Sequence, residues 1–302
     1  MTLRLEKGHA LGIVGESGCG KTTVALSSMN LLPSNAKITG GEILLDDENL
    51  VTKTEDEMNK IRWKKISLVF QGAQNALNPV FKVGDQIVEA IMTHNKTLTK
   101  SDAARRTREL LELVGVDPER AHDYPHEFSG GMKQRAVIAM ALSCDPEVLI
   151  ADEPTTALDV ITQGRILSLI RDLQSKLGLS LVVITHDLSL TAEMCTEIAI
   201  MYAGKVVEFG ETRDIYDRPM HPYTNALLGA FPSILGPIRK MKTLNGFPPD
   251  LRNPPAGCRL LSRCPYAEGR CKKEPDLEEI SPGHLAACYN WRNVKETWKK
   301  PS

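Results

Sequence analysis

Short apolar segments alternate with longer amphipathic ones along the first 230 residues of the chain. The apolar segments have strand length and carry no charge; they are residues 10–14, 66–70, 148–151 and 180–185. Between them, apolar residues recur at helical spacing, which predicts helices at residues 22–32, 101–114, 132–142 and 159–177. Strands that alternate with helices in this way indicate an α/β fold around a mostly parallel sheet.

Two of these helices also show which face turns toward the core. In the predicted helix at residues 101–114, the residues expected to face inward are Ala103, Leu110, Leu111 and Val114. In the predicted helix at residues 159–177 they are Ile166, Leu169, Ile170, Leu173 and Leu177. Gly115 and Gly178 follow the two helices directly, where glycine commonly ends a helix. Residues 41–51 and 198–209 instead have the pattern of hairpins, with turns at Asp46–Asp47 and at Gly204.

The pattern changes after about residue 230. Helical periodicity disappears, and six prolines crowd residues 232–255. We therefore expect a main domain at residues 1–230. Residues 231–302 would form a proline-rich linker and a small irregular module that carries cysteines.

Composition and charge narrow the class of protein. Lysine and arginine number 37 and aspartate and glutamate 38, so the net charge is −1. This charge balance excludes a strongly basic nucleic-acid-binding surface that extends over the whole chain. The longest apolar runs are too short to span a bilayer, and acidic Glu6 close to the start is not typical of a secretory signal. A cytosolic location is the default expectation.

A glycine-rich loop from Gly15 to Thr22 has the pattern G-x-x-x-x-G-K-[ST] between a predicted strand and helix. Glycines let backbone N–H groups curl around phosphate oxygens, and the helix that follows points its positive end at the same anion. Lys21 supplies charge to the terminal phosphates, and the Thr22 hydroxyl suits Mg²⁺. The alternative is a glycine turn that binds nothing, which the strand–loop–helix context disfavours. The predicted nucleotide contacts are Gly15, Glu16, Ser17, Gly18, Cys19, Gly20, Lys21, Thr22 and Thr23.

Cys19 lies inside this loop, at a helix N-terminus and close to Lys21. Both features lower the pKa of a thiol, so we expect a reactive thiol that bound nucleotide protects. The alternative is an inert small residue that fills the turn.

Two carboxylates follow the apolar strand at residues 148–151. Asp152 leaves the strand end, where it could hold Mg²⁺ through water, and Glu153 is placed to polarise an attacking water as a general base. The plainer interpretation is an acidic loop after a core strand. The apolar residues before the acids and the presence of Lys21 in the same chain disfavour it.

Ser129, Gly130 and Gly131 open the predicted helix at 132–142 and form a second anion-binding helix terminus. One nucleotide does not need two such termini from the same chain, whereas two chains that meet face to face would each close on the other's nucleotide. Taken alone, an ordinary capped helix is the simpler interpretation. The position of this turn shortly before the acidic strand favours the binding role.

Together these motifs resemble the nucleotide-binding subunit of ATP-binding-cassette (ABC) transporters. Gln71 in Val-Phe-Gln matches the family's Q-loop, and Ser129–Gln134 matches its signature sequence with two mild variants. Asp159 in Ala-Leu-Asp matches the D-loop, and His186 in Ile-Thr-His-Asp matches the switch histidine. The motifs follow the family's order and cover essentially all of residues 1–230.

The resemblance implies a P-loop NTPase fold of the ABC type, with a RecA-like core, an antiparallel β-subdomain and a helical subdomain at about residues 72–145. It implies hydrolysis of ATP with Mg²⁺ as cofactor. The implied catalytic residues are Glu153, His186 and Gln71, the Mg²⁺ ligands Thr22, Gln71 and Asp152, and the further nucleotide contacts Ser129, Gly130, Gly131 and Asp159.

Other features look like the oligopeptide/dipeptide branch of importers. They are Ala76–Pro79, His221–Thr224, Gly257-Cys-Arg and Arg263-Cys-Pro. The implied partners are a second ATPase subunit, homologous or identical, two membrane permease subunits and, through these, an extracytoplasmic solute-binding protein, with no nucleic acid. The chain would then lie peripherally at the cytoplasmic face of the membrane. Nickel importers share these features, and a soluble ABC ATPase that works without a permease is the second alternative.

Four of the seven cysteines lie close together near the C-terminus: Cys258, Cys264, Cys271 and Cys288. Their spacing lacks the close pairs of structural zinc sites, and a disulfide is disfavoured in the cytosol. Four thiolates on a loop-rich segment suit a 4Fe–4S cluster, which the peptide-importer resemblance also implies. Zinc and free thiols remain alternatives, and His284 is a candidate substitute ligand.

One feature departs from the family pattern. The family's adenine-stacking aromatic lies on a strand upstream of the phosphate loop, yet only 14 residues precede Gly15, and the first aromatic residue is Trp63. We therefore expect that this N-terminal strand is missing and that ATP binding is weakened, since stacking on a base contributes ~1–3 kcal/mol.

Overall fold

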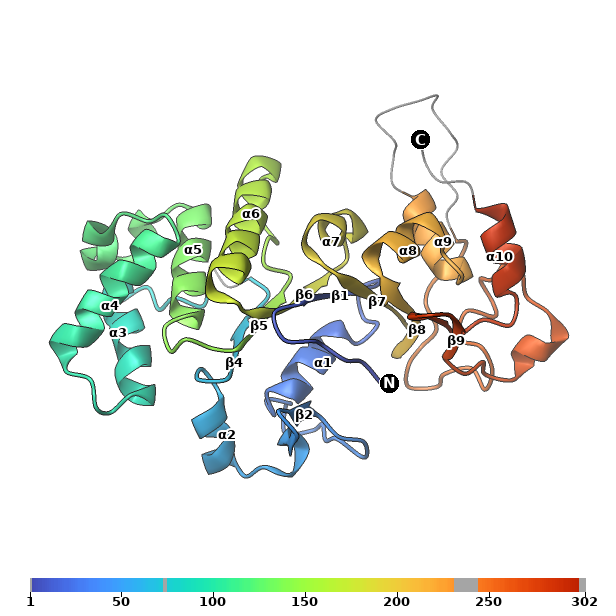
Figure 1. The fold of residues 1–302 in the computed structure, drawn as a ribbon, viewed down its shortest axis with the longest axis horizontal. Helices are drawn as coiled ribbons and strands as arrows, with labels where there is room; N and C mark the ends of the chain where they lie inside the picture. Colours follow the sequence, from blue (N-terminus) through green and yellow to red (C-terminus); the bar gives the residue numbers. More distant parts are fainter. Residues whose placement is uncertain (1, 73–74, 231–243, 299–302) are drawn as a thin grey trace. The chain divides into compact units, whose positions relative to one another are not determined.

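The computed structural model describes residues 2–72, 75–230 and 244–298 (Figure 1). The chain divides into two compact units. The first unit comprises Met1–Leu5, Ala10–Lys21 and Thr185–Ser302, and the second Glu6–His9 and Thr22–Ile184. Among the described residues, no helix has the length and apolar character needed to cross a membrane.

The second unit is built on three parallel strands. β4 (Ile66–Val69) pairs with β5 (Val148–Asp152), which pairs in turn with β6 (Ser180–Thr185). Most residues of these strands are buried, as their uncharged sequences predict. Asp152 lies opposite Ile184, so the carboxyl ends of β5 and β6 meet at one edge and carry the acids there.

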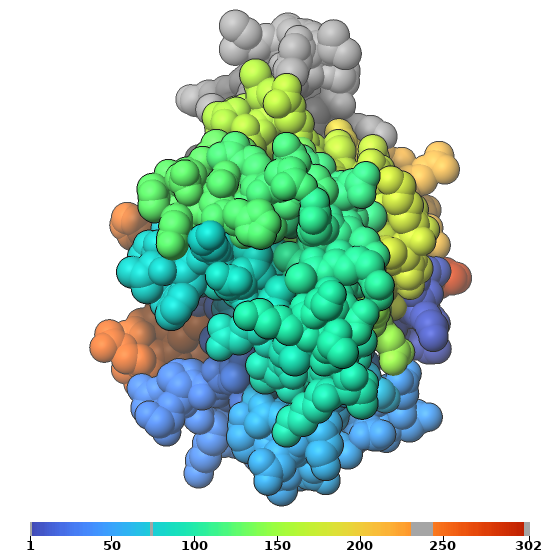
Figure 2. All heavy atoms as spheres, turned by 90° about the vertical axis from the view of Figure 1, so that its left-hand side faces the viewer, coloured from blue at the N-terminus to red at the C-terminus, as the bar shows by residue number. Residues whose placement is uncertain are grey.

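A layer of helices belongs to the same unit. It consists of α3 (Val83–His94), α4 (Lys100–Leu113) and α5 (Gly130–Ala141), with short 3₁₀ turns at Pro118–His122 and Pro125–Glu127. These helices lie side by side in Figure 1, and Figure 2 looks onto the face that they form. The predicted inward face of α4 is confirmed, because its four apolar residues are fully buried. Gly115 follows at a φ of +71°, which only glycine adopts without strain.

The long helix α6 (Val160–Leu177) begins at Asp159 and ends at Gly178, whose φ is +66°. Its buried residues are Ile166, Leu167, Ile170 and Leu173. The sequence predicted Leu169 and Leu177 instead of Leu167. Leu177 is 44% exposed because it is the last residue of the helix, where no further turn covers it, and Leu169 lies at the margin of the buried face.

The segments around α1 (Lys21–Ser28) complete the second unit. This helix ends four residues before the predicted position, because Asn30 adopts a φ of +50° and the Leu31 N–H donates to the Leu26 carbonyl at 2.8 Å. The predicted hairpin is confirmed, with Asp46 and Asp47 both at positive φ between β2 and β3. The remaining elements are β2 (Leu44–Leu45), β3 (Glu48–Asn49), the 3₁₀ turn Leu50–Thr52 and α2 (Glu55–Ile61).

The first unit contains a mixed sheet in the order β1-β7-β8-β10-β9. β1 pairs in parallel with β7, and the other neighbours are antiparallel. The strands are β1 (Ala10–Val14), β7 (Glu197–Tyr202), β8 (Lys205–Glu211), β9 (Glu278–Ser281) and β10 (His284–Ala286). The helices are α7 (Leu188–Met194), α8 (Thr212–Asp217), α9 (Pro222–Gly229) and α10 (Trp291–Thr297), with a 3₁₀ turn at Gly269–Lys272.

The C-terminal segment differs from the irregular module expected from the sequence. β10 joins the sheet by pairing with β8, with Leu285 opposite Phe209, and α10 follows. β10 and β9 have three and four residues, too few to show alternation in the sequence. β8, the strand through which β10 joins the sheet, lies far away in the chain, and β9 pairs with β10. The expected linker falls largely on residues 231–243, which lie outside the described residues.

Candidate nucleotide-binding site

The glycine-rich loop leaves the fully buried strand β1 and is closely packed at its first residue. A Cβ at Gly15 would lie 2.1 Å from the carbonyl oxygen of Met201, so no larger residue fits. Gly18 and Gly20 have φ angles of +80° and +103°, which are strained for any other residue. The loop therefore curls tightly, as a phosphate cradle requires.

The Lys21 side chain folds back into this loop. It is only 6% exposed, and its Nζ donates to the carbonyl oxygens of Gly15 at 2.7 Å and Glu16 at 3.2 Å. Thr22 and Thr23 occupy the exposed first turn of α1, and Ser17 and Gly18 are also exposed. The chain thus places side by side a buried ammonium, an exposed hydroxyl and the start of a helix. These groups suit the phosphates of a nucleotide and Mg²⁺.

Cys19 is buried, with 4% of its surface exposed. Burial raises the pKa of its thiol, and this effect outweighs the opposite effect of the Lys21 charge. The expectation of a low pKa is therefore wrong. The sequence shows the neighbouring lysine but not the burial, and the alternative of a residue that fills the turn agrees with the structure.

Residues far away in the sequence hold Glu16, and the sequence analysis missed them. The Glu16 N–H donates to the Tyr223 hydroxyl at 2.8 Å. Its carboxylate forms two bonds with Arg263, at 3.0 and 3.2 Å. Tyr223 and Arg263 belong to short sequence patterns noted above, but no sequence signal indicates which residue they contact.

A carboxylate and an amide meet at the edge of the second unit's sheet. Asp152, the last residue of β5, is 1% exposed. Glu153 follows at a φ of +46°, uncommon for a non-glycine residue and a frequent feature of functional sites. Its Oε2 accepts from Gln71 Nε2 at 2.8 Å and from the Thr156 hydroxyl at 2.9 Å. Two of the predicted catalytic residues, Gln71 and Glu153, therefore lie in direct contact.

The second candidate anion-binding turn is formed locally. Ser129 is exposed and caps α5, its hydroxyl accepting from the Met132 N–H at 3.3 Å. Gly130 and Gly131 form the first turn of this helix. A Cβ at Gly131 would lie 2.8 Å from Thr162 Cγ2, so glycine permits close packing of α5 against the start of α6.

The last two predicted residues lie at element ends. Asp159 caps α6, with carboxylate oxygens 3.0 Å from the Thr162 N–H and 2.7 Å from its hydroxyl. These bonds hold the pKa of Asp159 below its usual value. His186 is exposed in the turn between β6 and α7.

The four late cysteines line one small pocket of the first unit. Cys258, Cys264, Cys271 and Cys288 share it with residues that include His221. Burial raises the pKa of Cys264 to about 11 and that of Cys288 to about 12. All seven cysteines are among the described residues and none is in a disulfide. Within that part of the chain, no group of three or more potential ligands has the arrangement of a metal site.

His284, the candidate substitute ligand, has another partner. It is fully buried, and its Nε2 lies 2.8 Å from Oε1 of the equally buried Glu208. That glutamate also accepts from the backbone N–H groups of Met220 and His221. His284 is therefore part of a buried polar network and does not line the cysteine pocket.

Comparison with known proteins agrees with these motifs. Residues 1–156 match a family model described as ABC transporter, and residues 207–271 match one described as oligopeptide/dipeptide transporter, C-terminal region. The chain is 47% identical over 299 residues to a probable peptide ABC transporter ATP-binding protein of Sinorhizobium fredii, covering 97% of this chain and 89% of the relative. It is 46% identical over 289 residues to the dipeptide transport ATP-binding protein DppD of Bacillus subtilis, covering 94% and 86%.

The chain belongs to the ABC transporter family. It is an ATP-hydrolysing subunit of that family, and it has the family's fold. A dimeric post-hydrolysis structure of the ATP-binding cassette MJ0796, bound to ADP and Pi, matches this ABC ATPase with a TM-score of 0.60 and 30% identity. The match covers 70% of this chain and 88% of that one.

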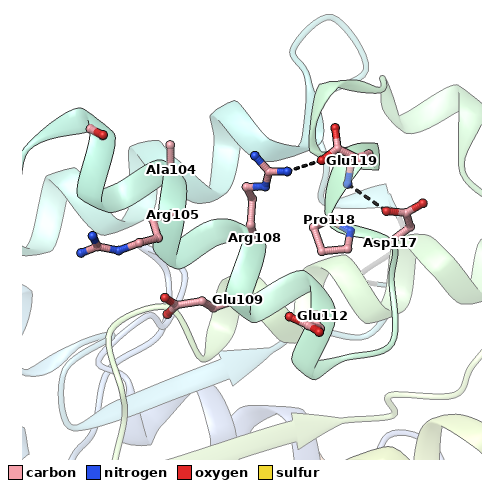
Figure 3. Close-up of a pocket in the computed structure, with 9 residues that line it drawn as sticks. Ala104, Arg105, Arg108, Glu109, Glu112, Asp117, Pro118 and Glu119 are labelled. Carbon is pink, nitrogen blue, oxygen red and sulfur yellow. Dashed lines mark hydrogen bonds and ion pairs between the residues drawn. The ribbon is translucent and has the colours of Figure 1, made fainter.

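An open pocket of about 590 Å³ on this ABC ATPase lies between α4 and the 3₁₀ turn Pro118–His122. Figure 3 shows that its lining is charged, with Arg108 paired to Glu119 and with Glu109 and Glu112 nearby. It contains none of the predicted nucleotide contacts. Charged side chains of both signs line this surface, and we assign it no role in the ATPase site.

Proposed function

We propose that this chain is the ATPase subunit of an importer, and that it couples ATP hydrolysis at an interface between two chains to uptake of di- or oligopeptides through membrane permease subunits. The contact that best supports the catalytic part is the one between Gln71 and Glu153 at 2.8 Å. It links a residue of the Q-loop to the proposed general base. Binding of nucleotide at the site can therefore affect the position of the Glu153 carboxylate, and the reverse.

Each residue has a role in this proposal. The backbone N–H groups of residues 15–20 and the Lys21 ammonium bind the phosphates of ATP. Glu153 orients the attacking water and accepts its proton, and Gln71 positions that carboxylate. His186 would contact the terminal phosphate from the end of β6. Thr22, Gln71 and Asp152 would hold Mg²⁺, which neutralises charge on the phosphates when bound.

The signature turn would act on the nucleotide of a second chain. Ser129 is exposed and caps α5, so its hydroxyl and the helix start are open to an anion. Support comes from the dimeric state of the matched cassette. The second subunit would be identical or homologous, and Asp159 would lie near the contact between the chains.

The assignment of Glu153 is tested by Glu153→Gln. The variant should retain ATP binding but lose at least about a hundredfold in turnover, because the general base is removed while the shape is kept. Glu147→Gln is a matched control at an exposed position just before β5 and should hydrolyse at the wild-type rate. Hydrolysis by Glu153→Gln at the wild-type rate would overturn the assignment.

The proposed substrate class is supported by the C-terminal region match and by the relatives' descriptions. Cells that lack this chain and require one amino acid should grow on peptides containing it only when the wild-type gene is restored. The Glu153→Gln gene should not restore growth. If peptide uptake is unchanged but nickel uptake fails, the chain serves a nickel importer instead.

Contact with the permease is proposed next to Gln71. Phe70, which directly precedes Gln71, and Val80 and Phe81 in the same unit are 45%, 70% and 55% exposed, and exposed apolar side chains suit contact with a partner. Peripheral attachment to the cytoplasmic face of the membrane follows from this contact, with the solute-binding protein reached through the permease. Phe81→Ser should reduce co-purification with the permease and leave basal ATPase activity unchanged; unaltered co-purification would contradict the proposed surface.

We also propose that the four late cysteines bind a 4Fe–4S cluster, since all four line one pocket and cysteine is its usual ligand. As arranged in the structure they do not form a metal-binding group, so no catalytic step is assigned to them. Anaerobically purified protein should contain about four irons per chain, which Cys271→Ser should remove. One zinc and no iron would indicate a structural metal instead, and neither metal would indicate free thiols.

A further inference from the structure

A C-terminal arginine contacts the phosphate loop of the same unit. Arg263 Nη1 and Nη2 lie 3.0 and 3.2 Å from the two carboxylate oxygens of Glu16. The arginine side chain is 7% exposed and the glutamate side chain 31%. A two-point bond between charged partners that excludes most water fixes the orientation of both groups.

The position of Arg263 is itself fixed by three further contacts. Its guanidinium lies 5.7 Å from the centre of the Tyr202 ring, and its Nη1 donates to the Tyr202 hydroxyl at 3.2 Å. Its Nε donates to the Asn245 carbonyl at 3.2 Å. These contacts set the position from which the Arg263 guanidinium bonds to Glu16, so that bond depends on where the segment around residue 263 lies.

The main chain of Glu16 is fixed at the same place. Its N–H donates to the Tyr223 hydroxyl at 2.8 Å, and the Tyr223 ring lies 4.7 Å from that of Tyr202. Both the backbone and the side chain of this loop residue are thus set by the C-terminal part of the unit. A binding loop held in its bound shape loses less conformational entropy when the ligand arrives.

A second arginine reaches the loop's neighbour. Arg259 donates to the carbonyl of Ala203, and the next residue, Gly204, donates to the Cys19 carbonyl at 3.0 Å. Arg259 directly follows Cys258, and Arg263 directly precedes Cys264. Both cysteines line the same small pocket, so each arginine is the direct chain neighbour of a residue that lines it.

We propose that Arg263 is a positioning residue for nucleotide binding, and that Arg263 and Arg259 transmit the state of the cysteine pocket to the phosphate loop. A change in the packing of the pocket, such as replacement of one of its cysteines, displaces the two arginines and loosens the loop at Glu16. ATP then binds more weakly, while the residues that carry out hydrolysis keep their places. The predicted kinetic result is a raised KM for ATP with an unchanged kcat.

The test is ATP affinity of the full chain, measured by titration with Mg²⁺ and a non-hydrolysable ATP analogue. Arg263→Ala should raise Kd roughly tenfold, the scale of one bond between charged groups, and should raise KM with little change in kcat. Glu16→Gln should weaken binding too, and the double variant should be no weaker than the stronger single one. Arg252→Ala is the matched control, because Arg252 also makes a two-point bond, with Asp250, but is 88% exposed and local.

The coupling to the pocket is tested in the same assay. Cys264→Ser should raise Kd in the wild-type background and have no further effect in the Arg263→Ala background. Unchanged Kd in Arg263→Ala, additive effects of Glu16→Gln and Arg263→Ala, or an equal loss in Arg252→Ala would overturn the positioning role. An equal effect of Cys264→Ser in both backgrounds would overturn the transmission. The inference depends on nucleotide binding by the loop and not on which solute is transported.

Discussion

The phosphate loop and the signature turn both present a helix start to an anion, but they are held in different ways. In the signature turn, Ser129 accepts from Met132, three residues away. In the phosphate loop, Glu16 is held by Tyr223 and Arg263, which are 207 and 247 residues away. The cap of one turn is a local bond, whereas the other turn depends on bonds to the C-terminal part of its unit.

The two turns are therefore sensitive to different changes. A locally capped turn loses about 1 kcal/mol when its cap is removed, and the damage stays near the helix end. A turn held by distant residues can be altered from far away without any change in its own sequence. The phosphate loop can therefore respond to events in the C-terminal segment, whereas the bond that caps the signature turn lies within the turn itself.

The largest expected effect is at the buried start of the phosphate loop. Gly15→Ala should lower the free energy of unfolding by about 3 kcal/mol or more, because the added methyl group meets a backbone oxygen at 2.1 Å that cannot move aside. Gly18→Ala is the matched control in the same loop, since its Cβ meets nothing within 4 Å, and it should cost only ~1–2 kcal/mol for its positive φ. Urea unfolding of both variants checks this, and equal losses would contradict the close packing.

The next largest effect is expected at a tyrosine hydroxyl that bonds to the phosphate loop, compared with a tyrosine hydroxyl that does not. Tyr223→Phe should cost about 1–3 kcal/mol, because it leaves the Glu16 N–H without its acceptor, and should weaken ATP binding several-fold. Tyr216→Phe removes a hydroxyl that donates to the Leu188 carbonyl instead. That control should lose stability without weakening ATP binding. Thermal unfolding and nucleotide titration of both variants test this prediction. A loss of ATP affinity in both would show that the effect is not specific to the phosphate loop.

A smaller effect is expected at the signature turn. Gly131→Ala should destabilise the protein by ~1–2 kcal/mol, since its methyl group would lie 2.8 Å from Thr162 Cγ2. Thr162→Ser removes that carbon but keeps the hydroxyl that donates to Asp159. The double variant should therefore regain most of the lost stability in urea unfolding. Failure of this rescue would mean that the glycine is needed for another reason.

The smallest effect is a pH dependence at the start of α6. Bonds from Thr162 hold the pKa of Asp159 below its ordinary value of about 3.9. The stabilisation is therefore full above that value and is lost as the pH falls through the lowered pKa. Asp159→Asn keeps a capping side chain but does not titrate. The difference in Tm between wild type and variant should shrink from pH 6 to pH 3, and a constant difference would contradict the assignment.

Local structure that is set by neighbours in the chain could be predicted from the sequence. The strand at residues 10–14 and the helices that end at Gly115 and Gly178 follow from apolar spacing and from the glycines that stop them. The pKa of Cys19 was misjudged, because its burial depends on residues packed around it and not on nearby Lys21. The strands at residues 278–286 were also missed, since β10 joins the sheet through β8, far away in the chain, and β9 is held only by its pairing with β10.

The most direct test of the account is amide hydrogen exchange in the two turns, compared between wild type and Arg263→Ala by mass spectrometry. The account predicts faster exchange in peptides that contain residues 16–20 of the variant, because a remote bond that holds the loop is lost. Peptides that contain residues 129–133 should exchange as in the wild type. Unchanged exchange in the phosphate loop, or an equal increase in both turns, would contradict the claim that a distant arginine holds the loop.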